Sequence, residues 1–180
     1  MISPAEIAQQ TLESLAEQFF YLSTGDWRSE RRYYTLKSGE IEEIVSMLTV
    51  RYLPAGSEEL IQLERSHGLE QGNILVCGAK MTWESSYNHQ PGRKPTSGAT
   101  VLGVKGNLLY RDRGFATTKP VTAEYTLRDS QTLQLRTEYG GSVFEEEIKL
   151  IGSDYRTRQT IISRAGEEIM IGQYLERRIG

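Results

Sequence analysis

Apolar and polar residues follow a helical pattern at the start of the chain and a strand pattern after Gly25. Ser3 is a candidate N-cap, with Pro4 at the first helical position and Glu6 where the acid of a capping box would lie. Apolar side chains then recur at roughly helical spacing: Ile7, Leu12, Leu15, Phe19 and Phe20. This pattern predicts an N-terminal helix over residues 1–24.

The rest of the chain is dominated by runs of β-forming residues between turn signals. A short helix is predicted over Ser57–His67, and the prolines and glycine within Gln90–Ser97 predict a loop. The expected strands are Arg32–Lys37, Ile44–Leu53, Ile74–Trp83, Thr100–Val104, Leu108–Arg111, Thr122–Leu127, Thr132–Tyr139, Val143–Leu150, Tyr155–Ser163 and Glu168–Glu176. The last four turns recur about every dozen residues, which is typical of an antiparallel meander.

An open sheet of about ten antiparallel strands would leave two unpaired edges, and closure into a barrel removes them. We therefore predict a mainly β chain of one domain over residues 1–180, with the helix at 1–24 and the barrel at 25–180. The expected barrel is closed, antiparallel, up-and-down and lipocalin- or calycin-like. Such a barrel encloses room for one small ligand. A β-sandwich is the alternative, with less interior space for polar side chains.

Composition narrows the function classes. The net charge of −3 gives no electrostatic case for a nucleic-acid partner, and no apolar run is long enough to span a membrane. Cys77 is the only cysteine, so no intramolecular disulfide is possible and a reducing, cytoplasmic location is expected. The two histidines, His67 and His89, lack the spacing of metal ligands, so we expect no metal site.

The hairpin from Gly140 to Thr160 carries the candidate chemistry. Alternation places Arg156, Arg158 and Thr160 on one face of a strand. An odd-length loop would bring Glu146 to that face opposite Arg158, whereas a two-residue loop would favour Glu145 or Glu147. These charges are costly in a core but useful in a pocket for an anionic ligand. The alternative is a surface ladder of weak ion pairs.

Both tryptophans occur at informative positions. Gly25-Asp26-Trp27 is similar to the start of lipocalin-like barrels, in which the tryptophan plugs the closed end, and Arg31 could then turn into the barrel. Met81 and Trp83 share a strand face with Cys77 and Ala79. That face is either ordinary core or a soft aromatic wall for a flat conjugated ligand.

The order and spacing of several segments resemble the S-type phycobiliprotein chromophore lyases of the CpcS, CpeS and CpcU kind. The matching segments are Phe19-Phe20, Gly25–Arg31, Val76–Ala79 with Trp83, Gly98–Leu102, Thr137–Tyr139, Glu145-Glu146 and Tyr155–Arg158. The resemblance covers nearly the whole chain. It implies a lipocalin-like barrel that binds an open-chain tetrapyrrole, phycocyanobilin or phycoerythrobilin, as substrate rather than as a permanent cofactor. The bilin would be delivered to a cysteine of an apo-phycobiliprotein.

The resemblance also implies roles for individual residues. Glu146 matches a catalytic pocket carboxylate near the pyrrole nitrogens, and the residues matching bilin-binding positions are Arg156, Arg158, Thr160, Trp83, Met81 and Arg31. A homodimer, or a heterodimer with a related lyase subunit, is expected. Two other functions remain open: a carrier of a fatty acid or other anionic lipid, and a non-catalytic subunit of a heteromeric lyase.

Overall fold

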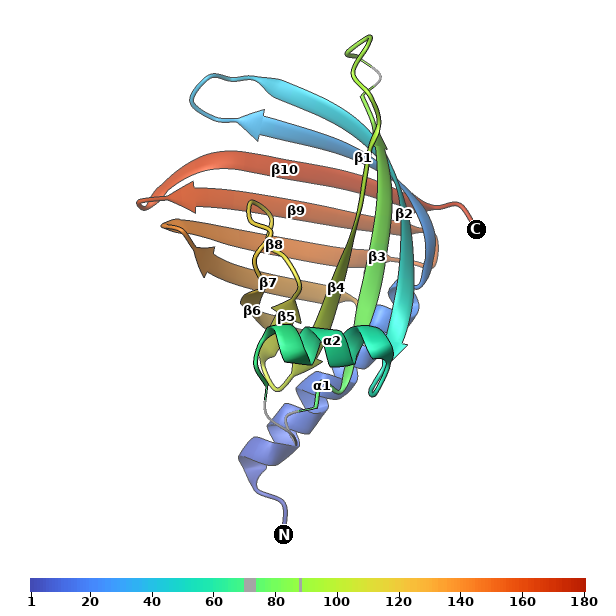
Figure 1. The fold of residues 1–180 in the computed structure, drawn as a ribbon, viewed down its shortest axis with the longest axis vertical. Coiled ribbons are helices and arrows are strands. Elements are labelled where there is room, and N and C mark those ends of the chain that lie inside the picture. Colours follow the sequence, from blue (N-terminus) through green and yellow to red (C-terminus); the bar gives the residue numbers. More distant parts are fainter. Residues whose placement is uncertain (70–73, 88) are drawn as a thin grey trace.

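The computed structural model describes residues 1–69, 74–87 and 89–180, and in them ten antiparallel strands close into a barrel (Figure 1). Strands adjacent in sequence pair with one another, and β1 closes the ring by pairing with β10. The strands are β1 (Gly25–Thr35), β2 (Ile41–Pro54), β3 (Cys77–Ser86), β4 (Thr96–Lys105), β5 (Leu108–Arg111), β6 (Val121–Leu127), β7 (Thr132–Tyr139), β8 (Ser142–Ile151), β9 (Tyr155–Arg164) and β10 (Glu167–Arg178). Two helices accompany them, α1 (Pro4–Ser23) and α2 (Glu58–Ser66). The predicted barrel is confirmed, and the sandwich alternative is wrong.

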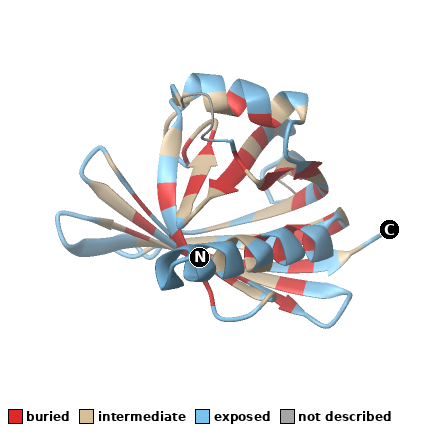
Figure 2. Ribbon diagram, turned by 90° about the horizontal axis from the view of Figure 1, so that it is seen from below, coloured by how far each residue is buried: buried red, intermediate tan, exposed pale blue. Residues whose placement is uncertain are grey.

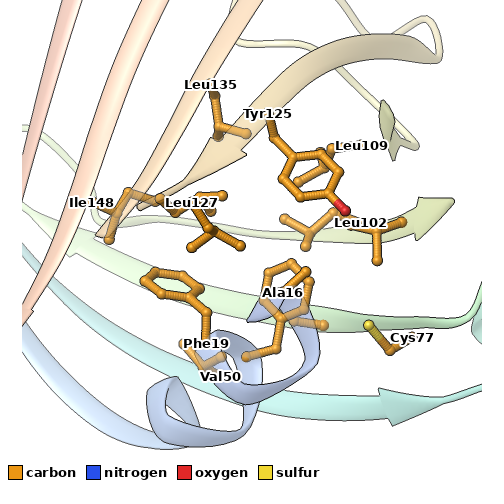
Figure 3. Packing of buried hydrophobic residues seen from close by; sticks show 14 of the residues in the cluster. Ala16, Phe19, Val50, Cys77, Leu102, Leu109, Tyr125, Leu127, Leu135 and Ile148 are labelled. Atoms are coloured by element: carbon orange, nitrogen blue, oxygen red, sulfur yellow. The ribbon is translucent and has the colours of Figure 1, made fainter. Parts of the chain in front are cut away.

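Helix α1 closes one end of the barrel with its C-terminal half. The predicted capping box is present: the Glu6 amide donates to Ser3 Oγ at 3.2 Å, and the Ser3 amide donates to Glu6 Oε2 at 2.8 Å. The first turns project away from the strands (Figure 1) and are exposed. Ala16 and Phe19 instead point into the barrel against Leu127 and the other apolar side chains of its interior (Figure 3).

Helix α2 packs on the outside of the barrel. Leu60 and Leu63 are buried there with Leu53 and Leu75. Gly103 permits this close approach, because a Cβ atom built on it would lie 2.8 Å from Leu75 Cδ1 and 3.0 Å from Leu60 Cδ2. The helix predicted over Ser57–His67 is thus confirmed, and packing against the sheet stabilises its two turns.

Several strand boundaries differ from expectation: β2 begins at Ile41 rather than Ile44, β3 spans Cys77–Ser86 rather than Ile74–Trp83, and the largest differences are at the starts of β1 and β4. Strand β1 begins at Gly25 instead of Arg32, because Trp27 and Ser29 alternate inward and are completely buried. A buried serine hides the apolar period that would have indicated this strand. Strand β4 begins at Thr96, inside the segment predicted as a loop.

Burial alternates along the strands, while the hairpin tips are exposed (Figure 2). Inside the barrel, the end closed by α1 is apolar. Beyond this end lies a layer of buried polar and charged side chains, which includes Ser29, Glu146, Arg156, Thr160 and Glu176. In the part of the chain that the structure describes, no helix is long and apolar enough to cross a membrane.

Candidate active site

The register of β8 and β9 selects which glutamate faces inward. Ile151 pairs with Tyr155, so the loop is the odd-length segment from Gly152 to Asp154. Glu146 is 5% exposed inside the barrel, whereas Glu145 and Glu147 lie on the outer surface. The expected inward position of Glu146 is confirmed. Its direct cross-strand partner is Thr160 and not Arg158 as expected; Arg158 pairs with Ile148 and reaches Glu146 diagonally.

Two guanidiniums flank the Glu146 carboxylate. Arg158 Nη2 donates to Glu146 Oε1 at 2.5 Å, and Arg111 Nη1 lies 3.5 Å from Oε2. Thr160 Oγ1 lies 3.5 Å from Oε1. Burial raises the pKa of Glu146, but Arg158 and Arg111 together outweigh that effect and hold it below its ordinary value. The side chain is therefore an anion at neutral pH.

Tyr174 of β10 holds two of the arginines predicted for the site. The Arg158 guanidinium carbon lies 5.2 Å from the centre of its ring, and that of Arg31 lies 4.9 Å from the same ring. The Tyr174 and Tyr33 hydroxyl groups are hydrogen-bonded at 2.9 Å. Arg31 Nε also donates to Ser29 Oγ at 3.1 Å. Arg31 thus turns into the barrel, as expected.

Arg156 lies deeper, beside the closed end. Its Nε donates to Glu176 Oε1 at 2.7 Å, and both side chains are almost completely buried. Its guanidinium carbon lies 5.1 Å from the ring of Trp27, whose Nε1 donates to the Ser23 carbonyl oxygen at 2.9 Å. Trp27 is fully buried beside the end of α1, which agrees with the predicted plug. Arg156 is therefore paired with a different buried carboxylate, Glu176, and not with Glu146.

Met81 and Trp83 lie on β3 and line the interior only in part. Met81 borders a small cavity of about 30 Å³ between the helix end and the arginines. Trp83 is half-buried; Gly98 on β4 leaves the space that the indole occupies, since an added Cβ would overlap it. Cys77, on the same strand, is fully buried, and burial raises the pKa of its thiol to about 12. It is not a nucleophile at neutral pH.

A larger groove of about 780 Å³ lies over β1, β2 and β8–β10; most of its lining residues are on the outer faces of these strands, but Arg31, Arg158 and Tyr174 of the interior cluster also line it. The ion pairs along it are exposed and mutually satisfied: Arg28–Glu30, Arg32–Glu43 and His89–Glu43. Such pairs contribute little energy. The buried charges inside the barrel are the stronger candidate for a site. The low dielectric of a protein interior strengthens the attraction between a buried charge and a ligand group of opposite charge.

Three residues of this interior cluster were not expected from the sequence: Arg111, Tyr174 and Glu176. The sequence signal that could have found them is the alternation of residues along a strand, because residues two positions apart share a face. Arg111 follows the buried Leu109 by two positions, and Tyr174 and Glu176 alternate on the last strand. Within the described residues, no group of three or more His, Cys, Asp or Glu side chains could hold a metal ion.

Comparisons with known proteins agree with this geometry. A family model described as "CpeS-like protein" matches residues 16–179. The chain is 55% identical to a "Putative phycocyanobilin lyase CpcS 2" of a Nostoc species over 99% of both chains. It is 49% identical to a "Putative chromophore lyase CpcV" of a Picosynechococcus species, over 94% of this chain and 84% of the relative. The solved S-type phycobiliprotein lyase CPES of Guillardia theta has the same fold, with a TM-score of 0.76 at 24% identity and 99% coverage of both chains.

Proposed function

The chain belongs to the CpeS-like family, and from this premise we propose that it is a phycobiliprotein chromophore lyase. It binds a linear tetrapyrrole in the barrel and attaches it through a thioether bond to a cysteine of an apo-phycobiliprotein. The observation that carries the proposal is the buried Glu146 carboxylate between Arg158 and Arg111. The buried Glu146 anion suits a ligand with several N–H donors, and the guanidiniums of Arg158 and Arg111 beside it suit that ligand's own carboxylates.

Glu146 is the residue we assign to the chemistry. Its anionic carboxylate accepts hydrogen bonds from pyrrole N–H groups and favours the protonated, more electrophilic bilin. The acceptor's thiol then adds across a carbon–carbon double bond of the bilin. A carbon–sulfur bond forms, the thiol proton passes to the tetrapyrrole, and no group leaves.

The nucleophile comes from the acceptor protein. The only thiol of this chain, Cys77, is buried and protonated at neutral pH. The lyase therefore acts mainly by presentation: it holds the bilin in one conformation and keeps water from the reacting atoms.

The remaining predicted residues bind the bilin. Arg158 and Arg31 face the carboxylate side chains of the ligand, held by the Tyr174 ring. Thr160 supports Glu146, and Met81 with Trp83 forms a soft wall against the flat conjugated faces. Arg156 contributes positive charge from behind these residues, because its Nε already donates to Glu176.

Glu146→Gln tests the proposal. The purified chain is incubated with phycocyanobilin, and in parallel with phycoerythrobilin, together with apo-phycobiliprotein subunits; covalent adduct is measured by mass spectrometry. We expect Glu146→Gln to slow transfer by about 100-fold or more and to shift the absorption of the bound bilin. The control is Glu147→Gln, the exposed neighbour on the same strand, which should transfer normally.

Unchanged transfer and spectrum in Glu146→Gln would remove this residue from the mechanism. If the wild-type chain binds bilin but transfers it only after a related lyase subunit is added, the chain is the partner subunit of a heteromeric enzyme. If it binds fatty acids and no bilin, it is a carrier.

A further inference from the structure

We propose that Arg111 is a specificity-determining residue that binds a carboxylate of the ligand, namely one propionate of the bilin. On binding, Arg111 gives up its contact with Glu146 and pairs with the ligand carboxylate instead. This inference rests on the proposed function and assigns a role to a residue that no sequence motif marked. Arg111 is the last residue of β5, is 9% exposed, and lies in the wall of the interior cavity together with Arg156 and Arg158.

The two contacts to Glu146 are unequal. Arg158 makes a hydrogen bond of 2.5 Å to Oε1, whereas Arg111 approaches Oε2 only to 3.5 Å, too far for a strong hydrogen bond. Glu146 would therefore remain paired with Arg158 if Arg111 turned to another anion. An incoming carboxylate displaces the weaker of the two contacts.

The guanidiniums also have unused donors. Arg111 Nε and Arg158 Nε are buried, and neither has a hydrogen-bond partner among the described residues. The adjacent acid, Asp112, accepts its hydrogen bond from Thr100 Oγ1 at 2.7 Å. A buried donor without an acceptor is unfavourable, so a ligand group that accepts hydrogen bonds would be stabilised here.

The charges of the cluster point to an anionic ligand. In the described part of the barrel interior, Arg111, Arg156 and Arg158 lie with two buried carboxylates, Glu146 and Glu176. These three guanidiniums exceed the two carboxylates by one positive charge, and the partly buried Arg31 beside Tyr174 adds another. A carboxylate compensates one of these charges and matches the planar fork of an arginine.

The backbone of Arg111 is held firmly, which fixes the point from which its side chain enters the barrel. It pairs with Leu102 of β4 and Val121 of β6, and its carbonyl oxygen lies 2.8 Å from His67 Nε2 at the end of α2. Binding then requires no additional ordering of this backbone segment.

The test compares a free acid with its ester. Phycocyanobilin and phycocyanobilin dimethyl ester are titrated into the wild-type chain, Arg111→Met and Arg111→Lys, and dissociation constants are read from absorbance. We expect Arg111→Met to weaken binding of the acid by about 10- to 100-fold and to leave the ester unchanged, with Arg111→Lys in between. Arg136→Met, an exposed arginine on the outer face of β7, is the control and should change neither constant.

Equal losses for acid and ester, or no loss for either, would overturn the proposal, because the residue would then act through packing or not at all. If the wild-type chain binds neither phycocyanobilin nor its dimethyl ester, the proposed function fails. The same comparison with palmitate and methyl palmitate then decides separately on Arg111. A loss confined to the acid supports a carboxylate site for another ligand, and no such loss overturns it.

Discussion

At the scale of single residues, the site depends on side chains that position other side chains. The ring of Tyr174 contacts the guanidiniums of Arg158 and Arg31, and Glu176 holds Arg156. None of these contacts is local in sequence. Arginines have many rotamers, and neighbours that restrict them lower the entropy lost when a ligand binds.

Tyr174→Leu should raise the dissociation constant of phycocyanobilin about tenfold, because two cation–π contacts are lost. Tyr174→Phe keeps the ring and removes only the hydroxyl bonded to Tyr33, so its affinity should stay near that of the wild type. Absorbance titration measures both. Equal losses in the two variants would show that the hydroxyl, not the stacking, matters.

The alternation of residues predicted correctly that Arg156, Arg158 and Thr160 share one face of a strand, and Glu146 joins them because the loop has the odd length on which that expectation depended. Alternation does not say which distant strand faces which. Arg111 reaches Glu146 across the barrel from β5, and its short strand carries little periodicity. Its partnership therefore could not be predicted from local pattern.

At the scale of elements, one arginine at the end of β10 connects the end of helix α1 with the turn between β8 and β9. Arg178, at the end of β10, donates to the Leu22 carbonyl oxygen and the Ser153 carbonyl oxygen at 2.8 Å each, and to the Thr24 carbonyl oxygen. It also lies 4.2 Å from the centre of the Trp27 ring. These bonds satisfy carbonyl groups at the C-terminus of α1, where a cation is favourable.

Arg178→Ala should therefore lower the free energy of unfolding by about 2–4 kcal/mol, since several charge-assisted hydrogen bonds and the contact with Trp27 are lost. Urea unfolding followed by tryptophan fluorescence measures it. Arg177→Ala, the exposed neighbour, is the matched control and should stay within about 0.5 kcal/mol of the wild type. A similar small change in both variants would contradict the role given to Arg178.

At the scale of the whole molecule, the closed barrel separates an apolar end from a charged middle layer. The two buried glutamates, Glu146 and Glu176, each have a pKa held below the ordinary 4.5: burial raises it, and the adjacent arginines lower it further than burial raises it. Both carboxylates bind protons more weakly in the folded chain than in the unfolded one. Their contribution to stability is thus present above pH 4.5 and is lost as the pH falls through the lowered values.

Acid unfolding tests this at the level of the whole barrel. The free energy of unfolding, measured by urea titration, should be constant near neutral pH and fall steeply below about pH 4.5. The double variant Glu146→Gln, Glu176→Gln should be less stable at pH 7 and show a flatter dependence below pH 4.5. A slope as steep as that of the wild type would assign acid sensitivity to other carboxyl groups.

The closure of the barrel was predictable from turns spaced evenly along the chain, because only a ring pairs every strand. The beginning of β1 was not predictable, since the buried layer there contains serine, and burial of a small polar residue depends on partners across the barrel. Polar layers inside a fold hide the very period that strand prediction uses.

The buried thiol of Cys77 has one more consequence. A protein that stores an electrophile must itself be unreactive toward it, or each turnover would risk permanent self-alkylation. With its single thiol enclosed and protonated at neutral pH, this chain offers no competing thiolate, and a bound chromophore remains available until a foreign cysteine arrives. The burial of Cys77 in the core therefore also protects the bound bilin from reaction with the protein that carries it.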